Sequence, residues 1–578
     1  MTSYVVVDLE TTVNNDQVGK FGGSPYYPAN RIVMAGWLGS DSSVNIDINP
    51  DSVRTPDTRL LIGHNIGFDL AYMLRDEQFS AWFWGNRVRV WDTMVAQYII
   101  SGQQDQYASL NYCSGIYGGT QKIDAIKEMW DNGIKTEDMD PDLLQTYLIG
   151  DLRNTETVYK GQLRIAQSMG ILPLLSSMME AVLCTTEMEF NGLHFDTDIA
   201  QAAIPALRDA IAEAEEAVIV ALVKDCKDFP YWFLNVGSDE QISSILFGGD
   251  FKYECRDYAL DDNGDIQHYK GGARAGQAKT KIHKRRLPLS GICRPGSTQQ
   301  KGAAGYYGVG EDKLKKIKHP AVVSILAYRG LIKDLNTYYI GYSAMTWQHD
   351  GCIHHKLNTV STETGRLSSS QPNLQNVNGK GDIKNCFTSR WGSDGVILQG
   401  DYSQLEVVYQ AWVSGDEAMS KDIIDGVDFH CKRLAYKTGE DYDHVFHMCK
   451  VVEDPEYLAA RKDIKSVSFQ KSYGAGIKAV SESTGIPKEE VKAIFEAEDM
   501  MYYGVVLFNQ QVAAEVEQSA VLTSKHSFAG YPVRKGTYRS VTGRRYVFTE
   551  DDAPQFMKDR GSDVSFSPTK IKNYPINS

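Results

Sequence analysis

Four residues that could bind a long anion with a flat end recur at every fourth position in one stretch of the chain. They are Arg461, Lys465, Phe469 and Tyr473, and on a helix they would form a single, slowly drifting stripe. Cations at the start of the stripe and rings at its end suit a triphosphate that carries a base. The glycines that follow Tyr473 predict the end of the helix. On spacing alone, an amphipathic helix with two solvated cations and two core rings is the more common explanation.

A second set of side chains has the types and spacing of a divalent-cation site. Asp8 and Glu10 follow a run of valines near the N-terminus, and being two residues apart they lie on the same side of an extended chain. Asp69 begins a predicted helix, and Tyr147 and Asp151 stand one helical turn apart on one face. Converging carboxylates can hold a cation, although an acidic strand end on its own is more often only solvated.

Taken together, these patterns resemble the family A (DNA polymerase I-like) DNA polymerases. The segment LQGDYSQLEVV, from Leu398 to Val408, and the stripe R-x3-K-x3-F-x3-YG match the family's first two polymerase motifs. The patterns DxE, NxxFD and YxxxD resemble, in order and interval, the three motifs of the proofreading domains attached to these enzymes. Because no 5′-nuclease domain precedes them, the resemblance indicates a replicative enzyme of bacteriophage type.

The resemblance covers nearly the whole chain and implies a multidomain fold of the α/β and α+β classes. An RNase H-like 3′–5′ exonuclease domain would be followed by a right-hand polymerase with thumb, palm and fingers, in which the palm is incomplete. The expected boundaries are 1–175 for the exonuclease domain, 180–345 for the thumb with a basic, loop-rich insert at 268–301, 346–420 for the first part of the palm, 421–530 for the fingers, and 531–578 for the truncated start of the C-terminal palm.

In the exonuclease domain the resemblance implies a two-metal site. Asp8, Glu10 and Asp151 would hold one Mg²⁺, Asp8 and Asp69 would hold a second, and Tyr147 would orient the attacking water. Two cations that share a carboxylate stabilise both the attacking and the leaving oxygens of phosphodiester hydrolysis. Since all four acids are present, the sequence predicts a working 3′→5′ exonuclease with two Mg²⁺ per active site and Mn²⁺ as a substitute.

In the polymerase the resemblance implies that Asp401 binds both catalytic Mg²⁺ ions with the help of the Tyr402 carbonyl. Asp401 would stand at the end of an apolar strand, and Ser403 would be the N-cap of the next helix. Glu406, packed near Tyr473, would occlude a ribose 2′-hydroxyl and so select deoxynucleotides. The full nucleotide-binding set implied in this way is Tyr402, Gln404, Glu406, His430, Arg461, Lys465, Phe469 and Tyr473.

Two segments are expected to contact DNA. The run Thr364–Ser370, followed by QPNLQN, resembles the family segment that follows the minor groove, where Arg366, Gln375 and Asn376 would donate to acceptors shared by all base pairs. The insert carries nine Lys and Arg residues from His268 to Lys301 and no acid, including Lys284, Arg285 and Arg286. Duplex-phosphate binding and a merely solvated cationic face explain this charge equally well. A processivity factor is a candidate partner of the insert.

The family's third polymerase motif, His-Asp-Glu, does not occur in the sequence. Asp551 and Asp552 follow an apolar strand and are the alternative source of a second metal carboxylate. We therefore expect exonuclease activity but little or no polymerase activity from this polypeptide alone, with the missing piece encoded just downstream or on a second chain. Two other functions stay open, an exonuclease-only DNA-binding remnant and a non-enzymatic scaffold that loads replication partners.

Composition adds only broad limits. The chain has 578 residues, 42% hydrophobic and 23% charged, so several globular domains are expected. Its nine scattered cysteines fit free thiols in a reducing compartment, and no signal peptide or membrane-length apolar run is present. These features predict a cytoplasmic protein, in the host cytoplasm if it is phage-encoded. The net charge of −14 argues only weakly against nucleic-acid binding, which depends on local patches.

Overall fold

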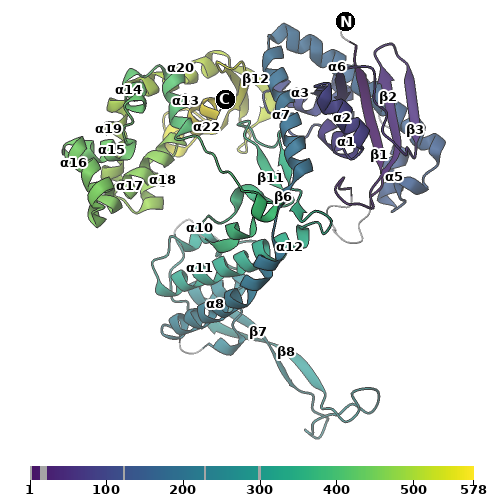
Figure 1. Ribbon diagram of the computed structural model, residues 1–578. Helices are drawn as coiled ribbons and strands as arrows, with labels where there is room; N and C mark the ends of the chain where they lie inside the picture. The colour runs from purple at the N-terminus through teal and green to yellow at the C-terminus, as the bar shows by residue number, and fades with distance from the viewer. Residues whose placement is uncertain are drawn as a thin grey trace. The chain divides into compact units, whose positions relative to one another are not determined.

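The computed structural model describes residues 3–13, 23–120, 124–226, 229–296, 301–379 and 381–577. The chain divides into two compact units, which Figure 1 shows as ribbons. The first unit contains residues 1–193, 354–376 and 397–578, and the second contains 194–353 and 377–396. The fold is mixed α/β and multidomain, as the sequence predicts.

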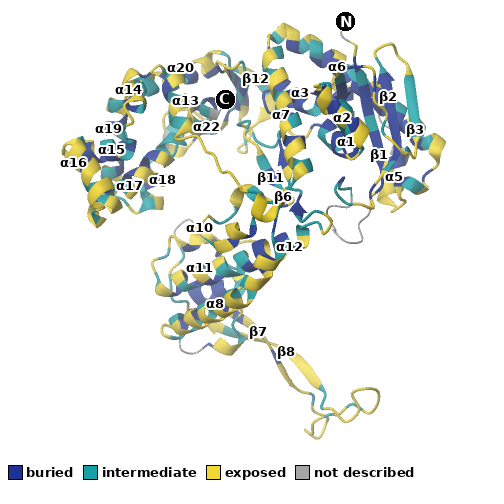
Figure 2. Ribbon diagram, viewed as in Figure 1, coloured by how far each residue is buried: buried dark blue, intermediate teal, exposed yellow. Residues whose placement is uncertain are grey.

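The N-terminal part of the first unit is built on a five-stranded sheet of order β3-β2-β1-β4-β5. The first three strands are antiparallel, and β4 and β5 add in parallel to β1. The valines and isoleucines of the central strands are buried on both faces, as Figure 2 shows for β1 and β2. The strands are β1 (Val5–Thr11), β2 (Ile32–Gly39), β3 (Val44–Ile48), β4 (Leu60–Gly63) and β5 (Arg89–Asp92).

Helices cover this sheet and position its polar residues. The longest, α6, begins with Pro141 after the N-cap Asp140 and ends where Gly170 adopts a left-handed conformation. Its buried Leu148 and Leu152 lie so close to β2 that a Cβ on Gly36 would come within 3.0 Å of both side chains. The helices are α1 (Ile66–Met73), α2 (Glu77–Gly85), α3 (Thr93–Ile100), α4 (Leu110–Tyr117), α5 (Asp124–Asp131), α6 (Pro141–Met169) and α7 (Leu172–Asn191).

The C-terminal part of the first unit is a group of helices followed by a three-stranded antiparallel sheet of order β12-β13-β14. Two arginines of this sheet reach the N-terminal part: Arg539 donates to the carbonyl of Met169 (3.0 Å) and Arg545 to that of Ile100 (2.8 Å). The principal elements are α13 (Leu405–Ser414), α15 (Phe429–Thr438), α17 (Pro455–Ser472), α19 (Lys488–Met501), α20 (Tyr503–Gln518), β12 (Val521–His526), β13 (Pro532–Arg539) and β14 (Arg545–Thr549).

The second unit is mainly helical and carries one long hairpin. Helices α8 (Thr197–Val223), α9 (Asp239–Phe247) and α11 (Pro320–Lys333) surround a core that includes Val218 and Ile325. The hairpin strands β7 (Gly249–Tyr258) and β8 (Thr280–Leu289) form a ribbon that extends away from these helices within the unit (Figure 1). Among the helices in the described part of the chain, none is both long and apolar enough to cross a membrane.

A buried ion pair joins α15 to α19. Arg433 donates to Glu498 at 2.5 Å, and both side chains are almost fully buried. Glu498→Gln should reduce the local stability of these helices by about 3–5 kcal/mol, because it leaves the guanidinium charge buried without its partner. Amide hydrogen exchange of α15 and α19 in the full chain measures this loss. Glu496→Gln is the matched control, since the exposed pair of Glu496 with Lys492 on α19 should contribute no more than about 1 kcal/mol.

Candidate functional site

The predicted carboxyl groups are carried by three elements that pack together, β1, α1 and α6. Asp8 and Glu10 are on the strand itself, Asp69 is in the first turn of α1, and Asp151 follows Tyr147 by one turn on α6. Three of these carboxylic acids are buried, with exposed fractions of 7% for Glu10, 4% for Asp69 and 5% for Asp151. Helices α1 and α6 both pack against β1, so the sequence patterns are brought to one place.

Asp69 lies in surroundings that disfavour its negative charge, which a bound cation would offset. Burial, and next the nearby charge of Asp8, raise its pKa well above the usual value. A divalent cation between the two would offset this repulsion, so the chemistry of the pair fits such an ion. Within the ranges that the structure describes, no three or more His, Cys, Asp or Glu side chains are arranged closely enough to hold a metal.

Asp92 positions this group, and the sequence analysis missed it. It is the last residue of β5, and its carboxylate accepts hydrogen bonds from the backbone N–H groups of Asn65 (3.1 Å), Ile66 (3.0 Å), Met94 (2.9 Å) and Val95 (3.3 Å). One side chain therefore caps both α1 and α3, which fixes the turn that carries Asp69. Burial raises the pKa of Asp92 to about 6. The available signal was an aspartate directly before the apolar helical run TMVAQYII.

A cavity of about 510 Å³ opens beside these acids. Its lining includes Glu10, Phe68 and Trp130. The Trp130 ring meets the Tyr147 ring edge to face, with centroids 6.0 Å apart. The cavity thus combines a buried carboxylate with exposed ring surface, which suits a ligand that has both a charged group and a flat face.

A second group of predicted residues converges in the C-terminal part of the same unit. The hydroxyl of Tyr473 donates to the carboxylate of Glu406, with distances of 3.0 and 2.9 Å to its two oxygens. Arg366 also donates to Glu406 and lies 3.5 Å from the Tyr473 hydroxyl. Three residues from segments far apart in the chain therefore form one hydrogen-bonded cluster, as the resemblance implies for Glu406 and Tyr473.

Helix α17 carries the predicted stripe and ends where predicted, at Ser472, with Gly474 in the left-handed conformation. Its core contacts are made by Ile464 and Val467, on a different face from the stripe. Phe469 is 58% exposed and its ring lies 4.8 Å from that of Tyr473. The alternative of two core rings is therefore wrong for Phe469, whose face is available to a ligand.

Arg461, at the start of the stripe, is held by Asp428. Its guanidinium donates to the carboxylate at 2.6 and 3.3 Å. Burial opposes ionisation of Asp428, but the hydrogen bonds from Arg461 and from the backbone of Cys431 outweigh it and lower the pKa of Asp428. Asp428 is also the N-cap of α15, so it ties the stripe to the helix that carries His430.

His430 and Lys465 differ in their surroundings. Burial, and next the charge of Arg433, lower the pKa of His430 to about 4, so its ring is neutral at pH 7. Its buried Nδ1 has no hydrogen-bond partner in the described part of the protein. Lys465 is exposed, on the same side of α17 as Phe469. The structure thus brings His430 toward Arg461 through Asp428 and leaves the Lys465 ammonium in solvent.

Two local predictions around Asp401 are wrong. Residues 395–402 form no strand, and the side chains of Val396 and Leu398 are 76% and 90% exposed. A short apolar run becomes a strand only beside a pairing partner, and none of the described residues pairs with it. Helix α13 begins at Leu405 after Gln404, which is in the left-handed conformation, so Ser403 is not its N-cap. Asp401 and Tyr402 lie exposed in this extended segment.

The acids proposed as substitutes for the missing motif have structural partners. Asp552 accepts hydrogen bonds from the Ser527 hydroxyl (2.6 Å) and the Ala529 N–H (3.0 Å), which holds the turn between β12 and β13. Asp551 accepts from the N–H of Asp552 in the short strand β15 (Asp551–Asp552). Both carboxylates thus contribute to local structure.

The residues expected to contact DNA lie at the surface. Gln375 and Asn376 are exposed in the 3₁₀ turn Leu374–Asn376. The basic run lies on β8, where ion pairs join Lys284 to Glu254 (3.5 Å), Arg285 to Asp257 (2.9 Å) and Arg286 to Asp250 (3.9 Å).

The description of 268–301 as a loop-rich insert is therefore wrong for residues 280–289, which form a strand. Strand β8 occupies 280–289 within it, and the acids that pair with this strand lie just before the acid-free stretch, on β7. Two glycines of the insert, Gly272 and Gly276, lie in the hairpin tip and have positive φ. Residues 297–300 of the predicted insert lie outside the described residues.

Comparison with known proteins identifies similar sequences for part of the chain. Residues 291–527 match the family described as DNA polymerase family A. DNA polymerase I of Bacillus subtilis (strain 168) is 32% identical over 225 residues, which are 38% of this chain and 24% of that protein. DNA polymerase I of Treponema pallidum (strain Nichols) is 23% identical over 475 residues, which are 81% of this chain and 40% of that protein.

Among solved structures, the POL domain of Pol1 from M. smegmatis, in complex with DNA primer-template and dNTP, has the same fold. Its TM-score is 0.63 at 18% identity, and the match covers 100% of this chain and 82% of that one. The chain thus has a mixed α/β fold that resembles this POL domain. The family match is confined to residues 291–527, and the matched region spans about a quarter of the length of the Bacillus subtilis protein.

Proposed function

We propose that this chain is part of a template-directed DNA polymerase of family A and bacteriophage type, acting in DNA replication on primer-template DNA and dNTPs. The observation that carries the proposal is the cluster of Arg366, Glu406 and Tyr473, which brings three predicted motifs together. Glu406, held by the phenol, fills the space that a ribose 2′-hydroxyl would need. Arg366 belongs to the proposed minor-groove segment, and its hydrogen bond to Glu406 would connect the side chain that excludes the 2′-hydroxyl with the primer terminus.

The triphosphate would lie along α17. Arg461, Lys465 and the neutral His430 would contact its phosphates, and Phe469 would present its exposed face to the base. For this to happen Arg461 must exchange Asp428 for phosphate, whose oxygens are an equally good bidentate partner. Asp401 and the Tyr402 carbonyl would hold Mg²⁺, which supplies charge neutralisation at the transferred phosphoryl group.

The proposed polymerase reaction needs a second carboxylate beyond those of residues 1–578. Two cations in close approach require acidic ligands on both sides, and Asp401 supplies only one. The exposed, unpaired run from Val396 to Leu398 fits the addition of a further strand directly beside Asp401.

We propose 3′→5′ proofreading as a second function, carried by the buried acids at the end of β1. The sheet order 3-2-1-4-5, with two parallel strands added to an antiparallel meander, is what an RNase H-like domain would have. Asp8, Glu10, Asp69 and Asp151 would hold two Mg²⁺, and Tyr147 would orient water. The hairpin β7–β8, with Lys284, Arg285 and Arg286, is the proposed site for duplex phosphates or for a processivity factor.

Nucleotide binding tests the polymerase proposal without requiring turnover. A primer-template complex of the chain should bind the next correct dNTP more tightly than the matching ribonucleotide, and Glu406→Ala should remove that difference. Glu417→Ala, an exposed acid of a neighbouring helix, should leave it intact. An exonuclease-only remnant or a scaffold would bind both nucleotides equally weakly.

Phe469→Tyr should relax discrimination against dideoxynucleotides. A phenol at this exposed position can replace the interaction that is lost with a missing 3′-hydroxyl, whereas the phenylalanine ring cannot. We expect the preference for dNTP over ddNTP to fall by at least about tenfold, a difference of about 1.4 kcal/mol. Competitive binding or incorporation in a polymerase-competent complex measures the ratio. Phe495→Tyr, on α19, is the control. Equal preferences for dNTP over ddNTP in the native and Phe469→Tyr proteins would disprove the role proposed for Phe469.

A further inference from the structure

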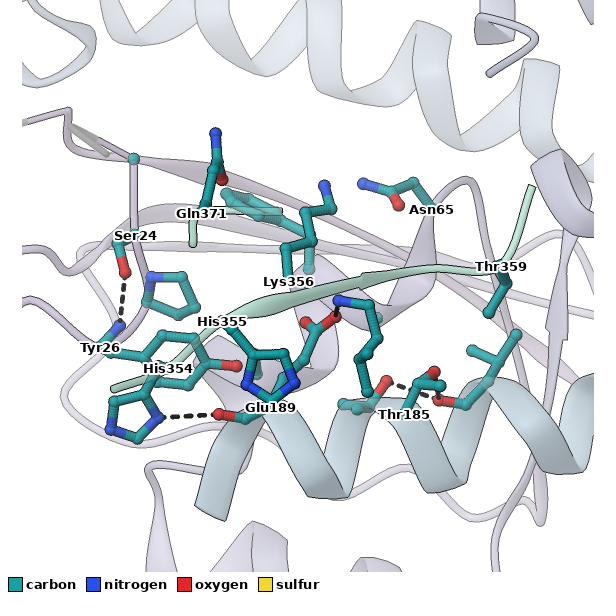
Figure 3. Close-up of a pocket in the computed structure, with 18 of the residues that line it drawn as sticks. Ser24, Tyr26, Asn65, Thr185, Glu189, His354, His355, Lys356, Thr359 and Gln371 are labelled. Atoms are coloured by element: carbon teal, nitrogen blue, oxygen red, sulfur yellow. Dashed lines mark hydrogen bonds between the residues drawn. The ribbon is translucent and has the colours of Figure 1, made fainter. Parts of the chain in front are cut away.

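A cavity of about 270 Å³ lies in the first unit, and Figure 3 shows residues that line it. The acids of the proposed exonuclease site are not part of its lining. Its lining includes Tyr26 from the stretch before β2, Glu189 from helix α7, and His355 and Lys356 from residues 354–359. Residues of α1, β5 and α3, with Gln371, complete the lining. The functions proposed above use none of these side chains.

Two buried polar atoms of this lining have no hydrogen-bond partner in the described part of the chain, the Tyr26 hydroxyl and Nδ1 of His355. Glu189 uses Oε1 to accept a hydrogen bond from the N–H of Leu357 at 2.6 Å, which leaves its other oxygen for the cavity. Buried polar groups in folded proteins are nearly always paired. Unpaired ones around a cavity therefore indicate a ligand that completes them.

The cavity also presents flat surfaces. The Tyr26 ring stacks on that of His354, with centroids 4.2 Å apart and an interplanar angle of 13°. His354 is fixed in turn by the hydrogen bond between its Nδ1 and the Glu189 carbonyl (2.8 Å). Phe68 adds a further ring to the lining. Rings beside polar edge groups suit a flat heterocycle that has both donors and acceptors on its edge.

Two polar groups of the lining, His355 and Glu189, are uncharged just below neutral pH. Burial lowers the pKa of His355, and burial raises the pKa of Glu189 to about 7. A neutral heterocycle therefore fits the interior better than an ion does. The exposed Lys356 is the cation available to a phosphate attached to that heterocycle.

We infer that this cavity binds a single nucleobase, with Tyr26, His355 and Glu189 as its hydrogen-bond partners. Its volume lies just under the range of about 300–1,000 Å³ that is usual for ligand pockets, so one base with its sugar fills it. The base comes either from a free nucleotide or from a single-stranded DNA end. The second source rests on the proposed exonuclease function, because Phe68 also lines the cavity that contains Glu10.

Fluorescence of 2-aminopurine tests the inference on the full chain in EDTA. The two probes are 2-aminopurine deoxyribonucleoside monophosphate and a short oligothymidylate that ends in 2-aminopurine. Stacking in the cavity should quench the saturable signal of at least one probe. Tyr26→Phe, which removes only the unpaired hydroxyl, and His355→Ala should each weaken binding at least about tenfold. Tyr112→Phe, on an exposed tyrosine of the same unit, should not.

The pH dependence supplies a second readout. The titratable and charged groups around Glu189 are Tyr26, His354, His355 and Lys356, with Asp92 on the lining contributed by β5. Ionisation of Glu189 should weaken binding as the pH rises from 6 to 8. Glu189→Gln, which stays neutral, should flatten this profile, whereas Glu187→Gln, on the exposed side of α7, should leave it unchanged.

Failure of both probes to bind, or equal binding by native, Tyr26→Phe and His355→Ala proteins, would overturn the inference. Binding of the mononucleotide alone would assign the cavity to free nucleotides, and binding of the oligonucleotide alone would assign it to strand ends. Mg²⁺-dependent degradation of single-stranded DNA, measured in parallel, separates this result from the proposed nuclease. Degradation without base binding would disprove the cavity proposal and leave the proposed nuclease function standing.

Discussion

Asp69→Asn is expected to reduce Mg²⁺-dependent degradation of single-stranded DNA by at least about a thousandfold, the scale on which removing one member of a catalytic unit acts. The same substitution should leave the fold as stable as before, or more stable, at pH 7.5. The folded-state pKa of Asp69 is raised by burial and by Asp8, so this carboxyl group stabilises the fold at low pH and loses that contribution as the pH rises through its pKa. A neutral amide avoids this loss.

Degradation of a labelled oligonucleotide and the thermal unfolding midpoint, both followed at pH 7.5, measure the two effects. Asp8→Ala combined with Glu10→Ala should lose activity to the same extent, while Asp57→Asn, an exposed acid of the same part, should change neither quantity. A fully active Asp69→Asn protein would disprove the role given to this carboxylate. Lost activity together with a strongly lowered midpoint would point to a structural role instead.

The sequence could predict what depends on local spacing. The stripe from Arg461 to Tyr473 lies on one helix because a four-residue interval needs nothing but helical geometry, and its end is set by a glycine with positive φ. In the same way DxE and YxxxD place their side chains on one side of a strand and one face of a helix. That these patterns lie in one region follows from the packing of α1 and α6 on β1, which the family resemblance supplied.

The features that the sequence analysis missed or misjudged depend on partners distant in the chain. Val396–Leu398 has the composition of a strand, but the described structure gives it no neighbour to pair with. The cations of β8 looked unpaired because the acids that pair with them lie on β7, before residues 268–301. Asp92 is an ordinary N-cap in the sequence, and only the fold shows that it also holds the helix of Asp69.

The base-binding cavity belongs to the same class of features. Tyr26, Glu189 and His355 are far apart in sequence, and no motif connects them. Their significance rests on two quantities that a sequence lacks, the burial of polar atoms and the absence, in the described part, of partners for them. Polar groups left unpaired by tertiary packing can therefore reveal sites where periodicity and motif spacing give no signal.

Residues 1–578, assayed as such, should extend a primer more slowly than about 0.01 s⁻¹, against turnover numbers of about 1–1,000 s⁻¹ for typical enzymes. The reason is the charge around the transferred phosphoryl group. Asp401 is exposed beside an unpaired segment, and the acids at Asp551 and Asp552 take part in local structure. One carboxylate holds two cations poorly, so the primer 3′-oxygen is neither activated nor brought into line.

Rapid-quench incorporation of a single dNTP, in an Asp8→Ala, Glu10→Ala background that preserves the primer, measures this rate. Asp401→Ala should abolish whatever extension remains, whereas Asp425→Ala, an exposed acid of the same part, should not. Adding a polypeptide that carries the His-Asp-Glu motif should raise the rate by orders of magnitude if its strand pairs with Val396–Leu398. Fast extension by residues 1–578 alone would contradict the proposal, and its loss in Asp551→Asn or Asp552→Asn would then identify the second carboxylate.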